Sequence, residues 1–349
     1  CLYRTNAQSR VLEENFIRQN IPYKIFGGQN FYQRKEIKDL IAYLKTVDNG
    51  RDNVAVKRII NVPKRGIGAS TVDKFQTFAE ANDMSFYDAL KNENAMAILG
   101  RSASKVKPFV DFIQRLRAES EYGKVSDLME IILEDTGYVR DLELEDTDEA
   151  RGRIDNINEF FSKIVDYEEK TENPTLSGFL EEVALVAEID GLDENSDYVV
   201  LMTVHSAKGL EFPKVFLCGM EDGLFPSYMT INSDDKTELE EERRLCYVAI
   251  TRAMESLTIT CAKVRMIRGE TYYGKVSRFV KEIPKLIMDT NVSMDNLSTK
   301  DGFVKPSAKS NAKPIFNTKP FDTKQYTVKK QEKLEYTVGD TVKHMKFGV

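Results

Sequence analysis

Residues 203–212 read TVHSAKGLEF and gather hydroxyl, imidazole, ammonium and carboxylate groups in one short polar loop. The loop follows an apolar, β-branched run at 198–204 and precedes a second run at 214–219, each the length of a buried strand. Loops at the carboxyl ends of parallel strands are where α/β proteins bind ligands. An ordinary connection between strands does not need Thr203, His205 and Glu211 together, so we predict a binding site here.

A second polar segment, residues 240–253, reads EEERRLCYVAITRA and has the pattern of a helix followed by an arginine. Its acidic start suits a helix N-terminus, and Leu245, Val248 and Ala249 form an apolar stripe. A solvated, charged helix explains the glutamates but not the Thr-Arg pair after the stripe. We therefore interpret the glutamates as structural and Arg252 as functional.

A glycine turn at residues 61–71, NVPKRGIGAST, offers a third candidate site. The GIG tripeptide predicts a tight turn into a helix, whose exposed N–H groups can bind a phosphate. A plain helix-capping turn would produce the same tripeptide. The adjacent cations favour contact with a duplex backbone. The predicted contact residues are Lys64, Arg65, Gly66, Ile67, Gly68 and Thr71.

One near-match to a phosphate-binding loop is rejected. Residues 269–276, GETYYGKV, almost fit the P-loop spacing, but Val276 lacks the hydroxyl that ligates Mg²⁺ and two tyrosines crowd the loop. We predict a β-hairpin turn there. No other segment of the sequence matches a P-loop or the acidic box that accompanies it.

An α/β scaffold must position these segments. Residues 1–30 predict a strand, a helix and a second strand, and the pattern of strand and helix resumes at about residue 192. Between these stretches, apolar residues recur at helical spacing. The sequence therefore predicts an α/β domain with a parallel sheet, interrupted by a large all-helical insertion. The predicted strands are 23–26, 198–204, 214–219 and 257–262, and the predicted helices include 7–19 and 238–253.

Bulk composition limits the other classes of function. With 41% hydrophobic and 30% charged residues, the 349-residue chain has the composition of an ordinary globular protein. The net charge of −6 gives no global positive field, so any contact with nucleic acid must be local. The four dispersed cysteines form no CxxC pair, which favours a reducing, cytoplasmic setting. No apolar run approaches the roughly 18 residues of a membrane span.

Both ends of the chain predict further segments. The first residue is Cys1 rather than Met, and CLYRTNAQSR reads as a strand already under way, so we expect additional N-terminal domains. Residues 289–335 are rich in Lys, Ser, Thr, Asn and Pro and predict a flexible linker. Residues 336–349 alternate polar and apolar side chains and predict the start of a truncated small β-barrel.

The two polar segments resemble a known pair of helicase motifs. VHSAKGLEF is similar to motif V, and RRLCYVAITRA to motif VI, of superfamily 1 DNA helicases of the PcrA/UvrD/Rep type. YRTNAQSRVLEE and GGQNFYQRKEIKD resemble the segments that join domains 2A and 2B of that family. The resemblance covers nearly the whole chain and implies a C-terminal half. A RecA-like (P-loop NTPase-like) domain 2A would comprise 1–30 and 192–288, and a helical 2B insertion 31–191.

Site roles follow from this resemblance. It implies that Glu211 binds the ribose of ATP and that Arg252 reaches the γ-phosphate, where a guanidinium neutralises charge on the transferred group. Expected contacts with the single strand are Asn6 and His205, with Thr203, Arg4 and Arg34 as weaker candidates. Arg268 stands where many relatives carry an aromatic residue. Either its guanidinium stacks on a base or that contact is lost.

The resemblance also implies cofactors and partners. ATP would bind with Mg²⁺, whose ligands are expected in N-terminal 1A and 1B domains of the same protein. Single-stranded DNA, DNA junctions and, through the tail, RNA polymerase are the expected partners. The complete protein is expected to be an ATP-dependent 3′–5′ DNA helicase in repair or replication, whereas this chain alone should not hydrolyse ATP. Two alternatives stay open: a non-catalytic DNA-binding or protein-interaction module, and the motor part of an AddA- or RecB-like helicase–nuclease.

Overall fold

Five parallel strands form the central sheet, in the order β2-β3-β1-β4-β6. The structure is a computed structural model that describes residues 1–188 and 197–290. The predicted β-barrel start at 336–349, and all of the predicted linker except residues 289 and 290, lie outside the described residues. The strands of the sheet are β1 (Leu2–Tyr3), β2 (Tyr23–Ile25), β3 (Val199–Thr203), β4 (Phe212–Leu217) and β6 (Ala253–Ile259).

Strands from both ends of the described chain alternate within this sheet. β1 lies between β3 and β4, with Leu2 opposite Met202 on one side and opposite Leu217 on the other. β2 pairs with β3 along Tyr23–Ile25. The prediction that two separate α/β stretches build one parallel sheet is therefore confirmed.

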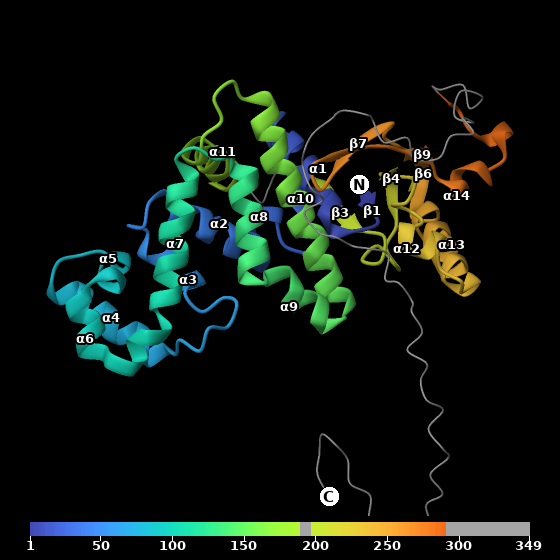
Figure 1. The fold of residues 1–349 in the computed structure, drawn as a ribbon. Helices are drawn as coiled ribbons and strands as arrows, with labels where there is room; N and C mark the ends of the chain where they lie inside the picture. Colours follow the sequence, from blue (N-terminus) through green and yellow to red (C-terminus); the bar gives the residue numbers. More distant parts are fainter. Residues whose placement is uncertain (189–196, 291–349) are drawn as a thin grey trace, which may run out of the picture. The chain divides into compact units, whose positions relative to one another are not determined.

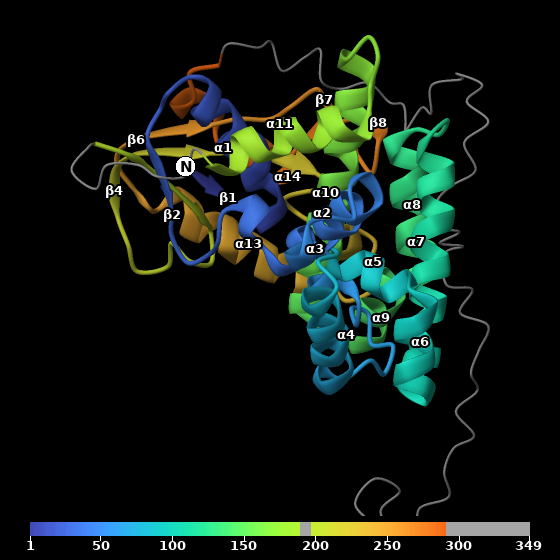
Figure 2. The ribbon, with the colours of Figure 1, turned by 90° about the vertical axis from the view of Figure 1, so that its left-hand side faces the viewer.

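Helices cover both faces of the sheet. Successive side chains of a strand point to opposite faces, so Leu201 and Met202 enter different cores. Helix α1 (Ser9–Arg18) packs on the face that contains Leu201, and α13 (Lys236–Ile250) and α14 (Arg278–Lys281) pack on the face that contains Met202. Figure 2 shows α1 above the strands and α13 below them.

Between residues 31 and 188 the chain is helical and contains no strand (Figure 1). Apolar positions at helical spacing form the buried side of α2, where Ile37, Leu40 and Leu44 are fully buried. Among the described residues, no helix is long and apolar enough to cross a membrane. The helices of this stretch are η2 (Phe31–Gln33), α2 (Lys35–Asp48), α3 (Asn53–Ile59), α4 (Ala69–Ala81), α5 (Phe86–Lys91), α6 (Glu93–Leu99), η3 (Gly100–Lys105), α7 (Lys107–Ser120), α8 (Val125–Thr136), α9 (Tyr138–Glu145), α10 (Asp148–Lys170) and α11 (Leu176–Glu188).

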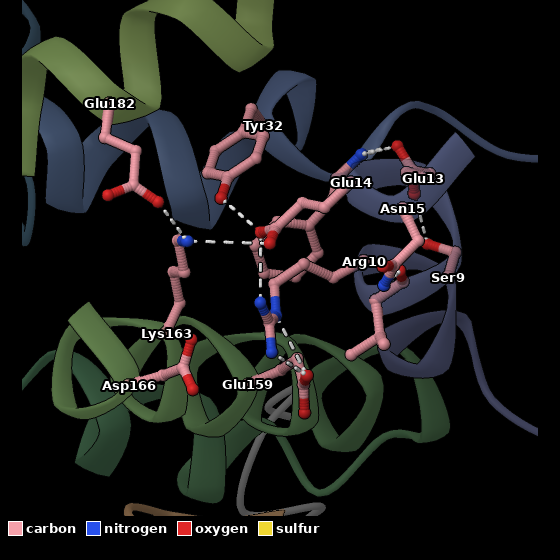
Figure 3. Close-up of polar contacts among 12 residues, drawn as sticks. Ser9, Arg10, Glu13, Glu14, Asn15, Tyr32, Glu159, Lys163, Asp166 and Glu182 are labelled. Carbon is pink, nitrogen blue, oxygen red and sulfur yellow. Dashed lines mark hydrogen bonds and ion pairs between the residues drawn. The ribbon is translucent and has the colours of Figure 1, made fainter. Parts of the chain in front are cut away.

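A buried ionic network joins α1 to α10 (Figure 3). Arg10 of α1 binds Glu159 of α10 at 2.7 Å, and Lys163 of α10 lies 3.5 Å from Glu14 of α1 and 2.6 Å from Glu182 of α11. Burial alone would raise the pKa of Glu14, but Arg10 and Lys163 hold that pKa below its usual value. The carboxylate is therefore ionised, and the network links the α/β part of the chain to the helical part.

The remaining strands lie outside the central sheet. β5 (Glu221–Asp222) pairs with β9 (Lys275–Val276), and β7 (Val264–Ile267) forms an antiparallel hairpin with β8 (Glu270–Tyr273). Arg268 and Gly269 form the two-residue turn, with φ of 55° and 72°, as hairpin turns of this length require. A hairpin is present, but the prediction that residues 269–276 form its turn is wrong, because only Gly269 belongs to the turn and β8 and β9 occupy most of the segment.

Several element boundaries differ from the prediction. The strand predicted at 214–219 is β4 at Phe212–Leu217, and the helix predicted at 238–253 is α13, which ends at Ile250. The predicted helix at 7–19 begins as a short 3-10 helix, η1 (Asn6–Gln8), before α1. The strand predicted at 257–262 starts earlier, at Ala253, because Ala253 already pairs with Phe212 of β4. This edge strand carries exposed Glu255 and Ser256, so the start of the strand lacks an apolar signal. The other helices are α12 (Tyr228–Ile231) and η4 (Lys285–Ile287).

Candidate functional site

Glu211 and Arg252 occupy neighbouring positions at the amino-terminal ends of β4 and β6. Phe212 pairs with Ala253, and the N–H of Phe212 donates a hydrogen bond of 2.9 Å to the carbonyl oxygen of Arg252. The two predicted ATP-binding residues, 41 positions apart in the sequence, therefore lie together at one edge of the sheet.

The guanidinium of Arg252 is held by its surroundings but is not saturated. Nε donates to the carbonyl of Val248 at 2.9 Å, Nη1 to the carbonyl of Leu210 at 2.8 Å and Nη2 to Oγ1 of Thr251 at 3.0 Å. A guanidinium has five N–H donors, so two remain for a ligand. Glu211 is exposed, and its carboxylate has no partner within the described part of the chain. An anion and a hydroxyl donor could both bind here.

The loop at 203–211 connects opposite edges of the sheet. Because β3 and β4 are parallel, the chain must return to the amino-terminal edge before β4 begins. It does so in helical turns, with the N–H of Ala207 donating to Thr203 and that of Leu210 to Ala207. Thr203 and His205 therefore lie at the carboxyl ends of the strands and Glu211 at the amino ends. The polar residues of this loop are thus divided between two edges of the sheet.

At the carboxyl-terminal edge, the predicted DNA contacts follow two adjacent strands. Val204 donates to the carbonyl of Tyr3 at 2.9 Å, so Arg4 and Asn6 follow β1 beside the start of the loop after β3. Asn6 and His205 are exposed. Thr203 is half-buried, and its Oγ1 lies 3.0 Å from Oγ of Ser206. The structure thus brings these residues to one edge.

Arg4 is bound to a residue that the sequence reading did not single out. Its Nε lies 3.0 Å and 3.2 Å from the two carboxylate oxygens of Glu242, and Nη2 lies 2.7 Å from Oε1. The side chain of Glu242 is 6% exposed and that of Arg4 24%. A buried acid within a run of charged residues gives no sequence signal of its own. The prediction that the glutamate run is structural fits Glu242.

His205 lies in the electrostatic range of this pair. Partial burial and the positive charge of Arg4 lower the pKa of His205, and Glu242 opposes them only in part. His205 is therefore a neutral imidazole at pH 7. It offers hydrogen bonds rather than charge.

Arg34, one of the three weaker candidates, is buried in the interior. Its Nη1 donates to Oδ1 of Asn156 at 2.7 Å and its Nη2 to Oγ of Ser9 at 2.7 Å. Burial is also the main cause of a lowered pKa for this arginine, which the nearby Glu13 opposes. The position of Arg34 suits a structural role at the junction of α1 and α10.

The glycine turn is separate from both edges of the sheet. Gly66 has a φ of 71°, Ile67 is 2% exposed and anchors the turn, and Gly68 is the N-cap of α4. Lys64 is exposed and Thr71 half-buried in the first turn of α4. The sequence reading missed Lys105, whose Nζ lies 3.2 Å from the carbonyl of Gly66, because it is 39 residues away.

Arg65 does not present its guanidinium to solvent at this turn. Nη1 donates to the carbonyls of Ile59 at 2.9 Å and Val62 at 3.1 Å, and Nη2 donates to the hydroxyl of Tyr43. These carbonyls lie at and beyond the end of α3, where helix carbonyl groups need donors. Arg65 therefore stabilises the turn through hydrogen bonds to its backbone carbonyl groups.

Arg268 lies at the tip of the β7–β8 hairpin, which contacts α10. The N–H of Gly269 donates to Oγ of Ser162 at 3.2 Å. Burial raises the pKa of Asp155 on α10, while Arg268 and Arg4 both act to lower it. Arg268 is exposed and lies within electrostatic range of the same carboxyl group as Arg4.

Comparison with known proteins identifies the family of the chain. The family model of the UvrD-like helicase C-terminal domain matches residues 1–264. ATP-dependent DNA helicase PcrA of Staphylococcus epidermidis is 45% identical over 349 residues, which are 99% of this chain and 46% of that protein. ATP-dependent DNA helicase PcrA of Staphylococcus aureus is likewise 45% identical over the same shares. The chain thus spans about half the length of the curated relatives that it matches, and it belongs to the family of UvrD-like helicase C-terminal domains.

Proposed function

We propose that the complete protein is an ATP-dependent DNA helicase, which moves 3′ to 5′ on single-stranded DNA and opens junctions during repair or replication in the cytoplasm. The observation that carries this proposal is the placement of Glu211 beside Arg252 at one edge of the sheet. The names of the PcrA relatives support ATP dependence and DNA unwinding. The direction of movement rests on the resemblance of the motifs.

In this proposal the chain supplies one motor domain and its insertion. Residues 1–30 and 192–288 form domain 2A, and residues 31–191 form the helical domain 2B. Domains 1A and 1B, in a part of the protein outside this chain, hold the P-loop and the ligands of Mg²⁺. No cluster of His, Cys, Asp or Glu suited to a metal ion occurs within the described part of this chain.

The residues present fit one wall of an ATP site. Arg252 keeps two N–H donors for the γ-phosphate while three hydrogen bonds fix its orientation. Exposed Glu211 accepts a hydrogen bond from the ribose. Bound Mg-ATP supplies the phosphoryl group whose transfer to water releases free energy. Because Arg252 belongs to a different domain from the P-loop, its contact forms only when the two domains close.

Helix α13 connects the proposed ATP and DNA sites. Glu242 binds Arg4 beside the carboxyl-terminal edge, and Arg252 follows the end of the same helix at the amino-terminal edge. Ten helical residues span about 15 Å. A displacement of α13 at one edge therefore moves Arg252 at the other. This arrangement supports coupling between nucleotide state and DNA grip.

At the DNA edge, neutral groups make the contacts. Asn6, Thr203 and His205 hydrogen-bond to the single strand, which lets the enzyme grip and release successive phosphates. Arg268, close to Asp155, is an additional contact at the hairpin tip. Arg4 acts through Glu242, and Arg34 is left out because its guanidinium is used in the interior.

The glycine turn is the proposed duplex contact of domain 2B. The N–H groups of residues 68–70 at the start of α4, which have no partner among the described residues, bind a backbone phosphate, and exposed Lys64 and Lys105 add positive charge. Gly66 allows the turn and Ile67 anchors it. Arg65 is not included, because its donors are bound to carbonyl groups.

Unwinding assays on tailed duplexes test the proposal. The complete protein with Mg-ATP should unwind a duplex with a 3′ single-stranded tail and leave a 5′-tailed duplex intact. DNA binding without unwinding of either substrate would instead indicate a non-catalytic module. Unwinding accompanied by DNA degradation would indicate the helicase–nuclease alternative. RNA polymerase, the partner proposed for the tail, should be retained by the complete protein and lost when the protein is truncated after residue 288.

A further inference from the structure

The end of β2 presents a cation and an aromatic ring on one exposed face. Tyr23 and Ile25 pack toward α1, so alternation places Lys24 and Phe26 on the opposite face of the strand. Lys24 is exposed, and the ring of Phe26 is 53% exposed. The N–H of Phe26 still donates to the carbonyl of Leu201 at 2.9 Å, which fixes the backbone. Phe26 directly follows β2, and its exposed ring has no packing reason within the described part of the chain.

Lys24 is available to an anion. Its Nζ lies 5.8 Å from the centre of the ring of Tyr198, the residue before β3, and Lys24 forms no ion pair with any described residue. Cations and aromatic rings side by side are the usual elements of surfaces that bind single-stranded nucleic acid.

The glycines after Phe26 connect this face to the DNA edge. Gly27 has a φ of 73°, and a Cβ there would lie 2.9 Å from Oγ of Ser206. A Cβ on Gly28 would lie 3.8 Å from Oδ1 of Asn6. The N–H groups of both glycines lack hydrogen-bond partners among residues 1–188 and 197–290. The glycine turn therefore lies against the loop after β3, at Ser206, and the segment after β1, at Asn6. It also leaves two backbone N–H donors without a partner among the described residues.

We propose that this face extends the single-strand site beyond Asn6: the ring of Phe26 stacks on an unpaired base, and Lys24 neutralises a phosphate. The open N–H groups of Gly27 and Gly28 lie between Phe26 and Asn6, where the backbone of the same strand would pass. Stacking requires the face of a base, so single-stranded DNA fits and a duplex does not. This inference rests on the proposed function, because it continues the DNA edge defined by Asn6 and His205.

Substitution of Phe26 in the complete protein tests the stacking. The probe is a single-stranded oligothymidine with 2-aminopurine at successive positions. Phe26→Ala should weaken binding about 5- to 100-fold and remove the fluorescence quenching at one position, because an aromatic–base stack contributes that much. Phe26→Tyr should retain both. The matched control is Val11→Ala, an exposed apolar side chain on α1 away from this face.

The salt dependence of binding tests Lys24. Lys24→Gln should reduce the slope of log affinity against log salt concentration by about 0.7, the contribution of one phosphate contact on a single strand. Lys281→Gln, at an exposed lysine of α14, should leave the slope unchanged.

The binding measurements distinguish failure of the proposed function from failure of the stacking inference. If the unaltered protein does not bind the oligonucleotide, the proposed function fails. If it binds, but Phe26→Ala binds equally well with unchanged quenching, this inference alone is overturned. A Phe26→Ala protein with a lowered melting temperature and normal quenching would also overturn it, because the ring would then pack against another part of the protein.

Discussion

Arg252 donates a hydrogen bond of 2.8 Å from Nη1 to the carbonyl oxygen of Leu210, the residue that precedes Glu211. The guanidinium is thus tied to the main chain that carries the other nucleotide-binding candidate. Lysine has a single ammonium group and cannot reproduce this bond together with those to Val248 and Thr251. The orientation of Arg252 is therefore set before any ligand binds.

Replacement of Glu211 should affect nucleotide binding alone. Because its carboxylate is exposed and has no partner in the described part of the chain, Glu211→Gln should leave the melting temperature unchanged. Loss of a charge-assisted hydrogen bond should weaken binding of a fluorescent ATP analogue by about tenfold in the complete protein. Glu255→Gln, at an exposed position of β6, is the control. Equal affinity for both variants would remove Glu211 from the site.

Replacement of Glu242 should weaken the coupling between DNA binding and ATP hydrolysis. Glu242→Ala leaves Arg4 without its partner at a site where the acid is 6% exposed and the arginine 24%. We expect a loss of about 2 kcal/mol in the free energy of unfolding, less than for a fully buried pair. We also expect a reduced stimulation of ATPase activity by DNA, which a purely structural pair would not change.

Two further variants test whether these effects belong to the ion pair of Glu242 with Arg4. Glu241→Ala removes a neighbouring exposed acid and should have little effect on either measurement. The exchange Arg4→Glu with Glu242→Arg should restore part of both losses, because the pair is re-formed in reverse. Normal DNA stimulation in Glu242→Ala would show that α13 does not couple the two edges.

The ionic network between α1 and α10 should dominate the stability of their junction. Lys163 is 3% exposed, so Lys163→Met leaves Glu14 with one cation and should cost about 3 kcal/mol in the free energy of unfolding. The lowered pKa of Glu14 contributes stability that is present above the ordinary carboxyl pKa and is lost as the pH falls through the lowered value.

Chemical denaturation at pH 7 and pH 4 measures this contribution. The loss caused by Lys163→Met should be smaller at pH 4, where the carboxylates begin to be protonated in the unfolded chain. Lys170→Met, at a 71% exposed lysine of the same helix, should cost less than about 1 kcal/mol. Equal effects of the two substitutions would contradict a buried network.

Glu130 should destabilise the protein at alkaline pH. Burial, then the charges of Asp127, Glu134 and Glu168, raise the pKa of Glu130 to about 7. Between the ordinary carboxyl pKa and this value the folded state holds a proton that the unfolded state has lost, so stability decreases as the pH rises through that range. Glu130→Gln should therefore raise the melting temperature at pH 8 and leave it unchanged at pH 4. The same shift for Glu119→Gln, an exposed acid on α7, would point to a general charge effect.

Local patterns predicted the fold well because each major element carries its own signal. The apolar run before Thr203 became β3, and helical periodicity identified α2 and the rest of the 31–188 stretch. β6 was misplaced because its first half is an exposed edge whose side chains need not be apolar.

The site was predicted less completely because it depends on pairings across the chain. The resemblance to helicase motifs indicated Glu211 and Arg252, but only the parallel arrangement of β3 and β4 shows that Glu211 and His205 lie at opposite edges. Arg4, Arg34 and Arg65 have the charge that DNA contacts need, yet their partners are residues and carbonyl groups of the protein itself. A single sequence does not reveal which arginines are already bound.

In the proposed function, Arg252 completes an ATP site, and the DNA site stands apart from it. The most direct measurement compares Arg252→Ala with the unaltered complete protein in DNA-stimulated ATP hydrolysis and in affinity for single-stranded DNA. We predict that hydrolysis falls by about 10³-fold or more and that DNA affinity changes by less than about threefold. Unimpaired hydrolysis, or a loss of DNA affinity as large as the loss of hydrolysis, would contradict the account.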